Sequence, residues 1–315
     1  MTTATAISAG NGSFVHEAML YRDADDYLNG TLAFIRGGIG AGEPVLVAVP
    51  GPNLRLIDGA LGPARDGVRL TDMAEAGRNP GRIIPGVLHA FVDAHPDGRV
   101  RIIGEPIWAG RSDVAYPACV QHEALINVAM ARHPVTILCP YDVTALRPDV
   151  LADAAATHPV LVDGRGRRTS PGYAEPARVV EAFNRPLPAP AEPPRVLLFD
   201  WAGLPAVRAL VADAAARHDL PEDRAIDLQI AVNEVATNAV THGRVPATLR
   251  VWPDGSVLIC EVNDSGEMTD QMAGRVPPAP NSEGGRGLLL VNHLCDLVRC
   301  HTDPGGTTVR MHVGR

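Results

Sequence analysis

Aromatic residues make up only 4% of this 315-residue chain, and no apolar run approaches the roughly 18 residues that a membrane-spanning helix needs. The 28 basic residues are outnumbered by 36 acidic ones and form no dense stripe, so a nucleic-acid-binding surface is not indicated. The first 13 residues lack the charged start and apolar stretch of a signal peptide. We therefore expect a cytoplasmic protein that binds neither membranes nor nucleic acid directly.

Cysteine is also scarce, with five residues in the whole chain. The number is odd and no pair has the Cys-x-x-Cys spacing, which argues against a disulfide framework and against a zinc ribbon. The expected state of these cysteines is therefore a reduced, buried thiol. They are Cys119, Cys139, Cys260, Cys295 and Cys300.

Proline, by contrast, is concentrated in one place. Residues 184–195 contain five prolines in twelve positions, and proline favours extended backbone while removing hydrogen-bond donors. This composition predicts a linker at residues 186–195. It separates an N-terminal domain, residues 1–185, from a C-terminal domain, residues 196–315.

The N-terminal domain alternates short apolar runs with helical patterns. The runs at residues 44–50, 100–103 and 135–139 are typical of buried strands. Helical patterns fill residues 24–36, 86–94 and 121–132, so we expect an α/β domain with a parallel sheet covered on both faces. The glycine-rich segment 37–42 is followed by Glu43 and Pro44 instead of Lys-Ser or Lys-Thr, so it is expected to be a turn and not a phosphate loop.

The C-terminal domain has a different order of elements. Helices are predicted at 204–218, 222–242 and from 288 to 294, and strands at 247–252, 257–263 and 307–313. A polar, proline-containing loop covers residues 267–283. This order predicts an α+β domain with helices on one face of a mixed sheet.

Polar residues recur on one face of the long helix predicted at 222–242. Glu234, Asn238 and His242 are spaced four residues apart, so they share that face. An amide oxygen can bind Mg²⁺ and a carboxylate one turn away can orient a nucleophile, which would suit a magnesium–phosphate site. A solvated polar stripe is the structural alternative.

Three further motifs follow in order along the chain. Asp264 and Gly266 end a predicted strand, where the carboxylate can accept a hydrogen bond from an exocyclic amine and the glycine permits a close turn. Gly285, Gly287 and Leu288 open a helix, whose exposed amides suit a phosphate, although no Walker A motif is present. Thr307 follows two glycines and begins the last strand.

The order Glu-x-x-x-Asn, Asp-x-Gly, Gly-x-Gly-Leu and Gly-Thr resembles the GHKL (Bergerat-fold) ATPases, and EVATNAVTHG is similar to the anti-sigma factor serine kinases among them. The resemblance implies a two-layer α+β Bergerat sandwich that binds ATP and Mg²⁺. It assigns catalysis to Glu234, both Mg²⁺ and nucleotide binding to Asn238, and nucleotide contacts to six further positions. These are Asp264, Gly266, Gly285, Gly287, Leu288 and Thr307. It also makes residues 267–283 the ATP lid, although Met268 stands where the family often has a second glycine.

The N-terminal domain resembles the MEDS sensory domain in its opening HEAMLY, in FIRGGIGAGEPVLVAVP and in GEPIWAGRS. The resemblance implies a three-layer RecA-like sheet without a phosphate loop, and a small-molecule signal. Four residues are candidate sensor groups. They are His16, Tyr21, Tyr141 and Asp142.

Together these features predict a signal-responsive anti-sigma regulatory factor, and the family resemblance implies a homodimer. It would bind Mg·ATP and phosphorylate a serine of a STAS-type antagonist, with a sigma factor as a further partner. One alternative is a non-catalytic switch that binds its partner in an ATP-dependent manner. The other is a sensor histidine kinase using His122, although that position lacks the residue pattern of a phosphoacceptor.

Overall fold

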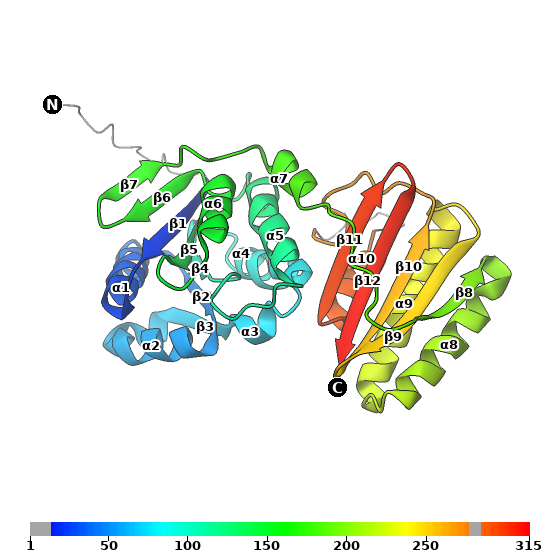
Figure 1. Ribbon diagram of the computed structural model, residues 1–315. Coiled ribbons are helices and arrows are strands. Elements are labelled where there is room, and N and C mark those ends of the chain that lie inside the picture. Colours follow the sequence, from blue (N-terminus) through cyan, green and yellow to red (C-terminus); the bar gives the residue numbers. More distant parts are fainter. Residues whose placement is uncertain (1–13, 277–284) are drawn as a thin grey trace. The chain divides into compact units, whose positions relative to one another are not determined.

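The computed structural model describes residues 14–276 and 285–315 (Figure 1). The chain forms two compact units. The first contains most of the described chain up to residue 179, and the second contains residues 180–315 together with the segments 77–85 and 113–122. Within the described residues, no helix combines the length and the apolar character that crossing a bilayer requires.

The first unit contains a seven-stranded sheet with the order β3-β2-β4-β5-β1-β6-β7. Neighbouring strands from β3 through β6 run parallel, and only the edge strand β7 is antiparallel to its neighbour. The sheet is therefore mixed, not purely parallel as the sequence predicted. The strands are β1 (Val15–Tyr21), β2 (Val45–Val49), β3 (Val68–Asp72), β4 (Val100–Gly104), β5 (Val135–Asp142), β6 (Val160–Asp163) and β7 (Gly166–Thr169).

Helices connect these strands, as parallel pairing requires. They are α1 (Ala24–Gly40), α2 (Gly51–Leu61), α3 (Met73–Ala76), a π-helix (Ile84–His89) continuing into α4 (Ala90–Asp93), α5 (Tyr116–Ala129) and α6 (Pro148–Thr157). Helix α7 (Pro176–Ala182) follows the last strand of the sheet, β7. All five residues of β2 are buried, which shows that both faces of the central strands are covered.

The glycine-rich segment after α1 was expected to be a turn from residue 37 onward, but the helix continues to Gly40. The reason is close packing. A Cβ atom at Gly38 would lie 2.8 Å from the Val45 side chain and 2.9 Å from that of Arg101. The glycines therefore let the last turn of α1 approach β2 and β4, and they form no phosphate loop.

The second unit contains a five-stranded sheet with the order β11-β12-β10-β9-β8. Every pairing is antiparallel, so the expectation of a mixed sheet was wrong for this unit. Two tight hairpins, β9–β10 and β11–β12, account for much of this arrangement. The strands are β8 (Arg195–Phe199), β9 (Ala247–Asp254), β10 (Val257–Asp264), β11 (Leu297–Asp303) and β12 (Gly306–Gly314).

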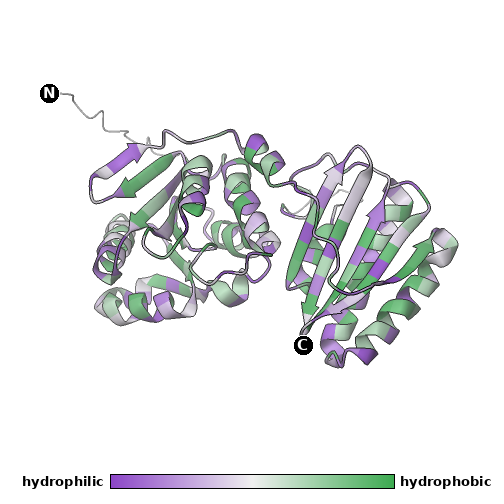
Figure 2. Ribbon diagram, viewed as in Figure 1, coloured by the Kyte–Doolittle hydropathy of each residue, from purple (hydrophilic) through white to green (hydrophobic). Residues whose placement is uncertain are grey.

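Three helices, α8 (Leu204–Arg217), α9 (Glu222–His242) and α10 (Gly287–Leu294), lie on one side of this sheet in Figure 1. They share a single apolar core with the strands. The buried residues of α9, including Val232, Val235, Ala236 and Ala239, recur at helical spacing. In Figure 2 the helices alternate between hydrophobic and hydrophilic residues, as expected for helices with one buried face. This orientation leaves the polar face of α9 available for a site.

Candidate functional site

The polar face of α9 carries Glu234 and Asn238, both partly buried. Their neighbours Val235, Ala236 and Ala239 are buried in the core, which fixes the rotation of the helix. The two polar side chains are consequently held one helical turn apart on the same side. This is the arrangement that the sequence predicted.

Asp264 is the last residue of β10, and its carboxylate organises the turn that follows. Asp264 Oδ1 accepts a 2.7 Å hydrogen bond from the backbone N–H of Gly266. The hydroxyl of Thr307 donates to the Gly266 carbonyl at 2.7 Å and accepts from the backbone N–H of Met268 at 3.1 Å. Thr307 therefore ties the segment after Asp264 to β12. Partial burial raises the pKa of Asp264 above its ordinary value, against the effect of the Gly266 N–H.

Two glycines allow the backbone to come close around Asp264. Gly306 has φ +140°, and a Cβ atom there would lie 2.0 Å from the Asp264 carbonyl oxygen. At Gly243, just after α9, a Cβ atom would lie 2.3 Å from Asp264 Oδ1. The sequence analysis did not single out Gly243, although a glycine directly after a long helix is a common end signal. Because Gly243 has no side chain, the Asp264 carboxylate can lie against the end of α9.

Helix α10 begins at Gly287, and its preceding residue Arg286 makes no side-chain cap. A Cβ atom at Gly287 would lie 3.0 Å from Glu234 Oε2 and 3.5 Å from Asn238 Nδ2. The start of α10 therefore faces the polar pair on α9. Because the first amides of a helix point outward with a positive dipole end, this position suits a phosphate group.

These elements surround one cavity of about 570 Å³. All seven residues that the sequence analysis proposed for nucleotide contacts line it. They are Asn238, Asp264, Gly266, Gly285, Gly287, Leu288 and Thr307. Glu234 is not among the lining residues; it lies behind Gly287. Within the predicted lid 267–283, residues 277–283 lie outside the described part of the chain, whereas Met268 lines the cavity.

The four candidate sensor groups of the first unit divide between two faces of the sheet. Side chains alternate along a strand, so His16 and Tyr21 of β1 point to opposite faces. The ring of Tyr21 packs edge-on against Tyr27 of α1 at 4.9 Å. Tyr21 is in register with Asp142 of β5, whereas Tyr141 belongs to the other face. His16 and Tyr21 therefore cannot serve a single site.

The Tyr21 face holds a buried carboxylate that the sequence analysis missed. Glu105, directly after β4, accepts a hydrogen bond from the Tyr27 hydroxyl at 3.2 Å and from Asn53 Nδ2 at 2.9 Å. Burial raises the pKa of Glu105 to about 8, although these two hydrogen bonds act in the opposite direction. The group lies at the carboxyl ends of β1 and β4, where open α/β sheets bind ligands. The sequence signal that could have identified Glu105 is an acidic residue directly after an apolar strand.

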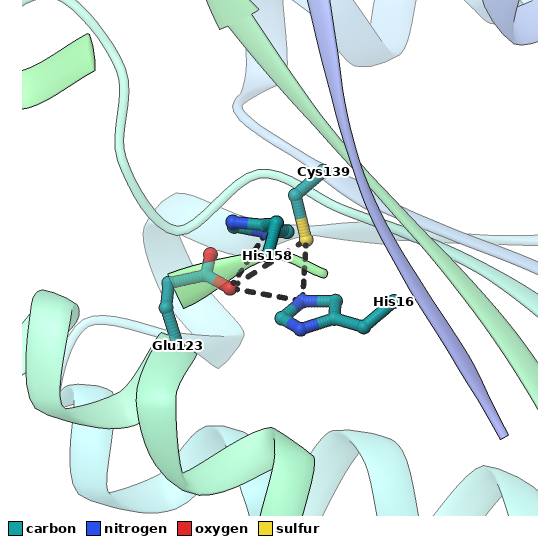
Figure 3. A group of neighbouring side chains, drawn as sticks. All are labelled: His16, Glu123, Cys139 and His158. Carbon is teal, nitrogen blue, oxygen red and sulfur yellow. Dashed lines mark hydrogen bonds and ion pairs between the residues drawn. The ribbon is translucent and has the colours of Figure 1, made fainter. Parts of the chain in front are cut away.

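The other face gathers His16, Glu123, Cys139 and His158 in a buried cluster (Figure 3). His16 Nε2 lies 3.2 Å from Glu123 Oε2, and the Tyr141 ring is 5.5 Å from that of His158. Two of the four sensor candidates thus belong to this face. Glu123, Cys139 and His158 were not among the predicted sensor residues.

The histidine considered as a phosphoacceptor, His122, is only 1% exposed and lies in α5. A phosphoacceptor histidine must reach solvent on a helix of a dimerising hairpin. Helix α5 instead lies between β4 and β5 in the chain, two neighbouring parallel strands of the seven-stranded sheet. The geometry therefore gives no support to a histidine kinase.

Comparisons with known proteins find one family model in each half of the chain. Residues 15–159 match the family model of MEDS, the MEthanogen/methylotroph, DcmR Sensory domain, and residues 199–313 match that of the histidine kinase-like ATPase domain. The serine-protein kinase RsbW of Bacillus licheniformis is 33% identical over 115 residues, which is 32% of this chain and 72% of that protein. RsbW of Bacillus subtilis is 32% identical over the same shares.

Among solved structures, the RsbU and RsbW domains of a Mycobacterium tuberculosis protein are 21% identical with a TM-score of 0.30. The match covers 39% of this chain and only a third, 33%, of that chain. The two resemblances seen in the sequence motifs are confirmed by the family models and by the RsbW relatives. The chain carries a MEDS domain and belongs, through the histidine kinase-like ATPase domain that follows it, to the family of RsbW serine-protein kinases.

Proposed function

We propose that this chain is a signal-responsive anti-sigma regulatory factor. Residues 1–185 would sense a small molecule, residues 186–195 would link the domains, and residues 196–315 would bind Mg·ATP in a Bergerat sandwich. The C-terminal domain would then phosphorylate a serine of a STAS-type antagonist and bind a sigma factor. The observation that carries the proposal is the convergence of all seven predicted nucleotide-contact residues on one cavity.

Each residue would have a distinct task at the nucleotide. The amide oxygen of Asn238 would bind Mg²⁺, which neutralises charge on the phosphates. Glu234, one turn away and beside the start of α10, would orient the serine hydroxyl. Asp264 would accept a hydrogen bond from the adenine amine, with Thr307 holding the turn below it. Backbone amides at Gly285 and Gly287 would contact the phosphates. Catalysis would rest mainly on positioning and charge neutralisation.

Met268 favours a second candidate, a non-catalytic switch that binds its partner in an ATP-dependent manner. The related kinases often have glycine at this position, and glycine permits backbone conformations that methionine resists. Here the N–H of Met268 is already bonded to the Thr307 hydroxyl, and its side chain lines the cavity. A lid constrained in this way is compatible with nucleotide binding and less suited to rearranging for transfer.

A phosphotransfer assay distinguishes the two candidates. The full chain would be incubated with Mg²⁺, γ-labelled ATP and a purified STAS-type antagonist encoded in the same genome. A kinase transfers label to a serine, and Glu234→Ala abolishes the transfer while ATP still binds. The switch candidate predicts no transfer under any condition, together with ATP-dependent capture of the antagonist or a sigma factor.

Two further measurements address the remaining expectations. Acid-labile label on the chain itself, lost in His122→Ala, would identify a histidine kinase and contradict both candidates. Sedimentation of the chain with and without ATP would test whether it forms a homodimer, which the family resemblance implies. Neither expectation rests on a contact seen in the described residues.

A further inference from the structure

Four side chains with metal-binding atoms meet inside the first unit (Figure 3). They are His16 of β1, Glu123 of α5, Cys139 of β5 and His158 at the end of α6. None of the four is more than 1% exposed. Their ligand atoms all lie within 4.8 Å of one another. Two imidazoles, a carboxyl and a thiol are thus buried together away from solvent. Burying such groups costs free energy unless each has a partner.

The sheet register brings these residues together from distant parts of the sequence. In the parallel pair β1–β5, Ala18 lies opposite Cys139, so His16 and Cys139 are two positions apart and on one face. Strand β6 pairs with the other side of β1, and His158 comes just before it. Glu123 reaches the same point from α5, which packs over this face.

The distances within the cluster match those between the ligands of a tetrahedral metal ion. His16 Nε2 and His158 Nε2 lie 3.2 Å and 3.4 Å from Glu123 Oε2, and Cys139 Sγ lies 3.5 Å from His16 Nε2. Zinc bonds of about 2.0–2.1 Å to nitrogen or oxygen and about 2.3 Å to sulfur give tetrahedral edges of roughly 3.3–3.6 Å. The remaining pairs, at no more than 4.8 Å, can close by small side-chain rotations.

Surrounding hydrogen bonds fix which ring nitrogens carry protons. Asn127 Nδ2 donates to the carbonyl of Thr157 at 2.8 Å, so its Oδ1 faces His16 and must accept from His16 Nδ1 at 3.2 Å. His158 Nδ1 donates to the carbonyl of Ala154 at 2.8 Å. Both neutral imidazoles therefore direct an Nε2 lone pair toward the cluster. Ligating histidines in proteins are oriented in this way, with the second nitrogen bonded to a carbonyl or amide oxygen.

The resulting arrangement has more acceptors than donors. Two Nε2 lone pairs face one carboxylate oxygen, and within the described structure neither Glu123 Oε1 nor His158 Nε2 has a hydrogen-bond partner. Burial, together with His158, lowers the pKa of His16 to about 4, which favours its neutral ring. A cation between these atoms would give both Nε2 lone pairs and Glu123 Oε2 a common partner.

We propose that His16, Glu123, Cys139 and His158 bind one Zn²⁺ ion in a closed tetrahedral site inside the sensory domain. The thiol and two imidazoles select a transition metal over Mg²⁺ or Ca²⁺, which prefer oxygen ligands. Four protein ligands leave no open position, as in structural zinc sites. The ion would join β1, β5, α5 and the entry to β6, and binding would release the thiol proton of Cys139.

Cobalt titration of the metal-free full chain tests this site directly, because tetrahedral Co²⁺ reports its ligands by colour. The proposal predicts saturation at one equivalent, intense visible bands typical of tetrahedral coordination, and a near-ultraviolet band from thiolate-to-cobalt charge transfer. Zn²⁺ should displace the cobalt and remove all bands. Absence of these bands in the unmodified chain, or displacement by Mg²⁺, would overturn the proposal.

Variants then assign the ligands. Cys139→Ser should lose the charge-transfer band, and His158→Ala should weaken metal binding at least tenfold. Cys119→Ser is the matched control, because Cys119 is also a buried thiol but lies outside the cluster, and it should behave like the unmodified chain. The assignment would be refuted if Cys139→Ser kept the charge-transfer band and His158→Ala bound the metal as tightly as the unmodified chain. Circular dichroism of each variant, compared with the unmodified chain, shows whether it remains folded. Mg·ATP affinity should be the same in all of them, because that site lies in the other unit.

Discussion

The carboxylate of Asp264 has one oxygen committed to the Gly266 N–H, which determines what a substitution there would do. In Asp264→Asn the amide oxygen can keep that bond, so its NH₂ group would face the cavity. A donor would then meet the adenine amine, also a donor. We expect ATP affinity to fall by about tenfold or more, since a bond to a charged group contributes roughly 1.5–3 kcal/mol.

Fluorescence titration with a labelled ATP analogue measures this loss. Asp254→Asn, at the exposed end of the β9–β10 hairpin, provides the control and should bind normally. Equal affinities for the two variants would remove Asp264 from the nucleotide site.

Gly306 is the residue whose substitution should disturb the site through the backbone. Its φ of +140° is strained for any other residue, and a Cβ atom would lie 2.0 Å from the Asp264 carbonyl oxygen. We expect Gly306→Ala to destabilise the C-terminal domain by about 1–3 kcal/mol or more. Urea unfolding measures the change. Gly314→Ala, where a Cβ would sit at an ordinary 3.4 Å from Asp296, should cost much less; a larger loss there would contradict this explanation.

At this scale, the residues that line the cavity could be predicted and the buried clusters could not. Asn238, Asp264 and Gly287 lie in short motifs whose order is itself informative. His16 and His158 are separated by more than 140 positions and meet only through the parallel register of β1 and β6, which no local spacing encodes. The expectation that Cys139 is simply a buried thiol was correct about its burial but said nothing about its neighbours.

The elements of the C-terminal domain followed closely from hydrophobic periodicity. Helix α9 occupies 222–242, the predicted range, because its apolar residues recur at helical spacing over five turns. Strands β8 and β11 were not predicted: both lie at the edges of the sheet, and in neither do buried and exposed residues alternate regularly. Strand β1 was not predicted because VHEAMLY includes two buried polar residues: His16 belongs to the cluster described above, and Glu17 pairs with Arg167. Buried polar side chains in a strand interrupt the apolar pattern from which the strand would be predicted.

The buried carboxyl of Glu105, at the carboxyl ends of the parallel strands, should make the stability of the first unit depend on pH. Glu105 faces Tyr27 of α1, Asn53 of α2, Tyr21 of β1 and Asp142 of β5, and its pKa is raised to about 8. A carboxyl with a higher pKa in the folded state binds its proton more tightly there. The contribution of Glu105 to stability is therefore fully present below its ordinary pKa of 4.5 and is lost as pH rises toward 8.

Glu105→Gln should remove this dependence, so the first unit should lose less stability between pH 5 and 8 than in the unmodified chain. Hydrogen exchange of the β1 and β4 segments measures it for this unit alone. Asp25→Asn, an exposed carboxylate on α1, should leave the pH dependence unchanged. An unaltered profile in Glu105→Gln would show that this carboxyl is not the responsible group.

For the whole molecule, ligand effects should separate by unit, because each proposed site is built within one of them. All cavity-lining residues lie between Val235 and Val309, and all four cluster residues lie between His16 and His158. A ligand at 100 times its dissociation constant stabilises the state that binds it by about 2.7 kcal/mol. Mg·ATP should thus slow hydrogen exchange chiefly in the C-terminal domain, and Zn²⁺ chiefly in the N-terminal one. Uniform protection by either ligand would contradict separate sites.

Mg·ATP binding at the Asn238 cavity is the central claim, and isothermal titration calorimetry of the full chain tests it most directly. Asn238→Ala should lose measurable Mg·ATP binding while its circular dichroism stays unchanged. Asn233→Ala, on the same helix but bonded to Arg208 of α8, should bind as the unmodified chain does. Equal Mg·ATP affinity in Asn238→Ala and the unmodified chain would show that the nucleotide site has been assigned to the wrong residues.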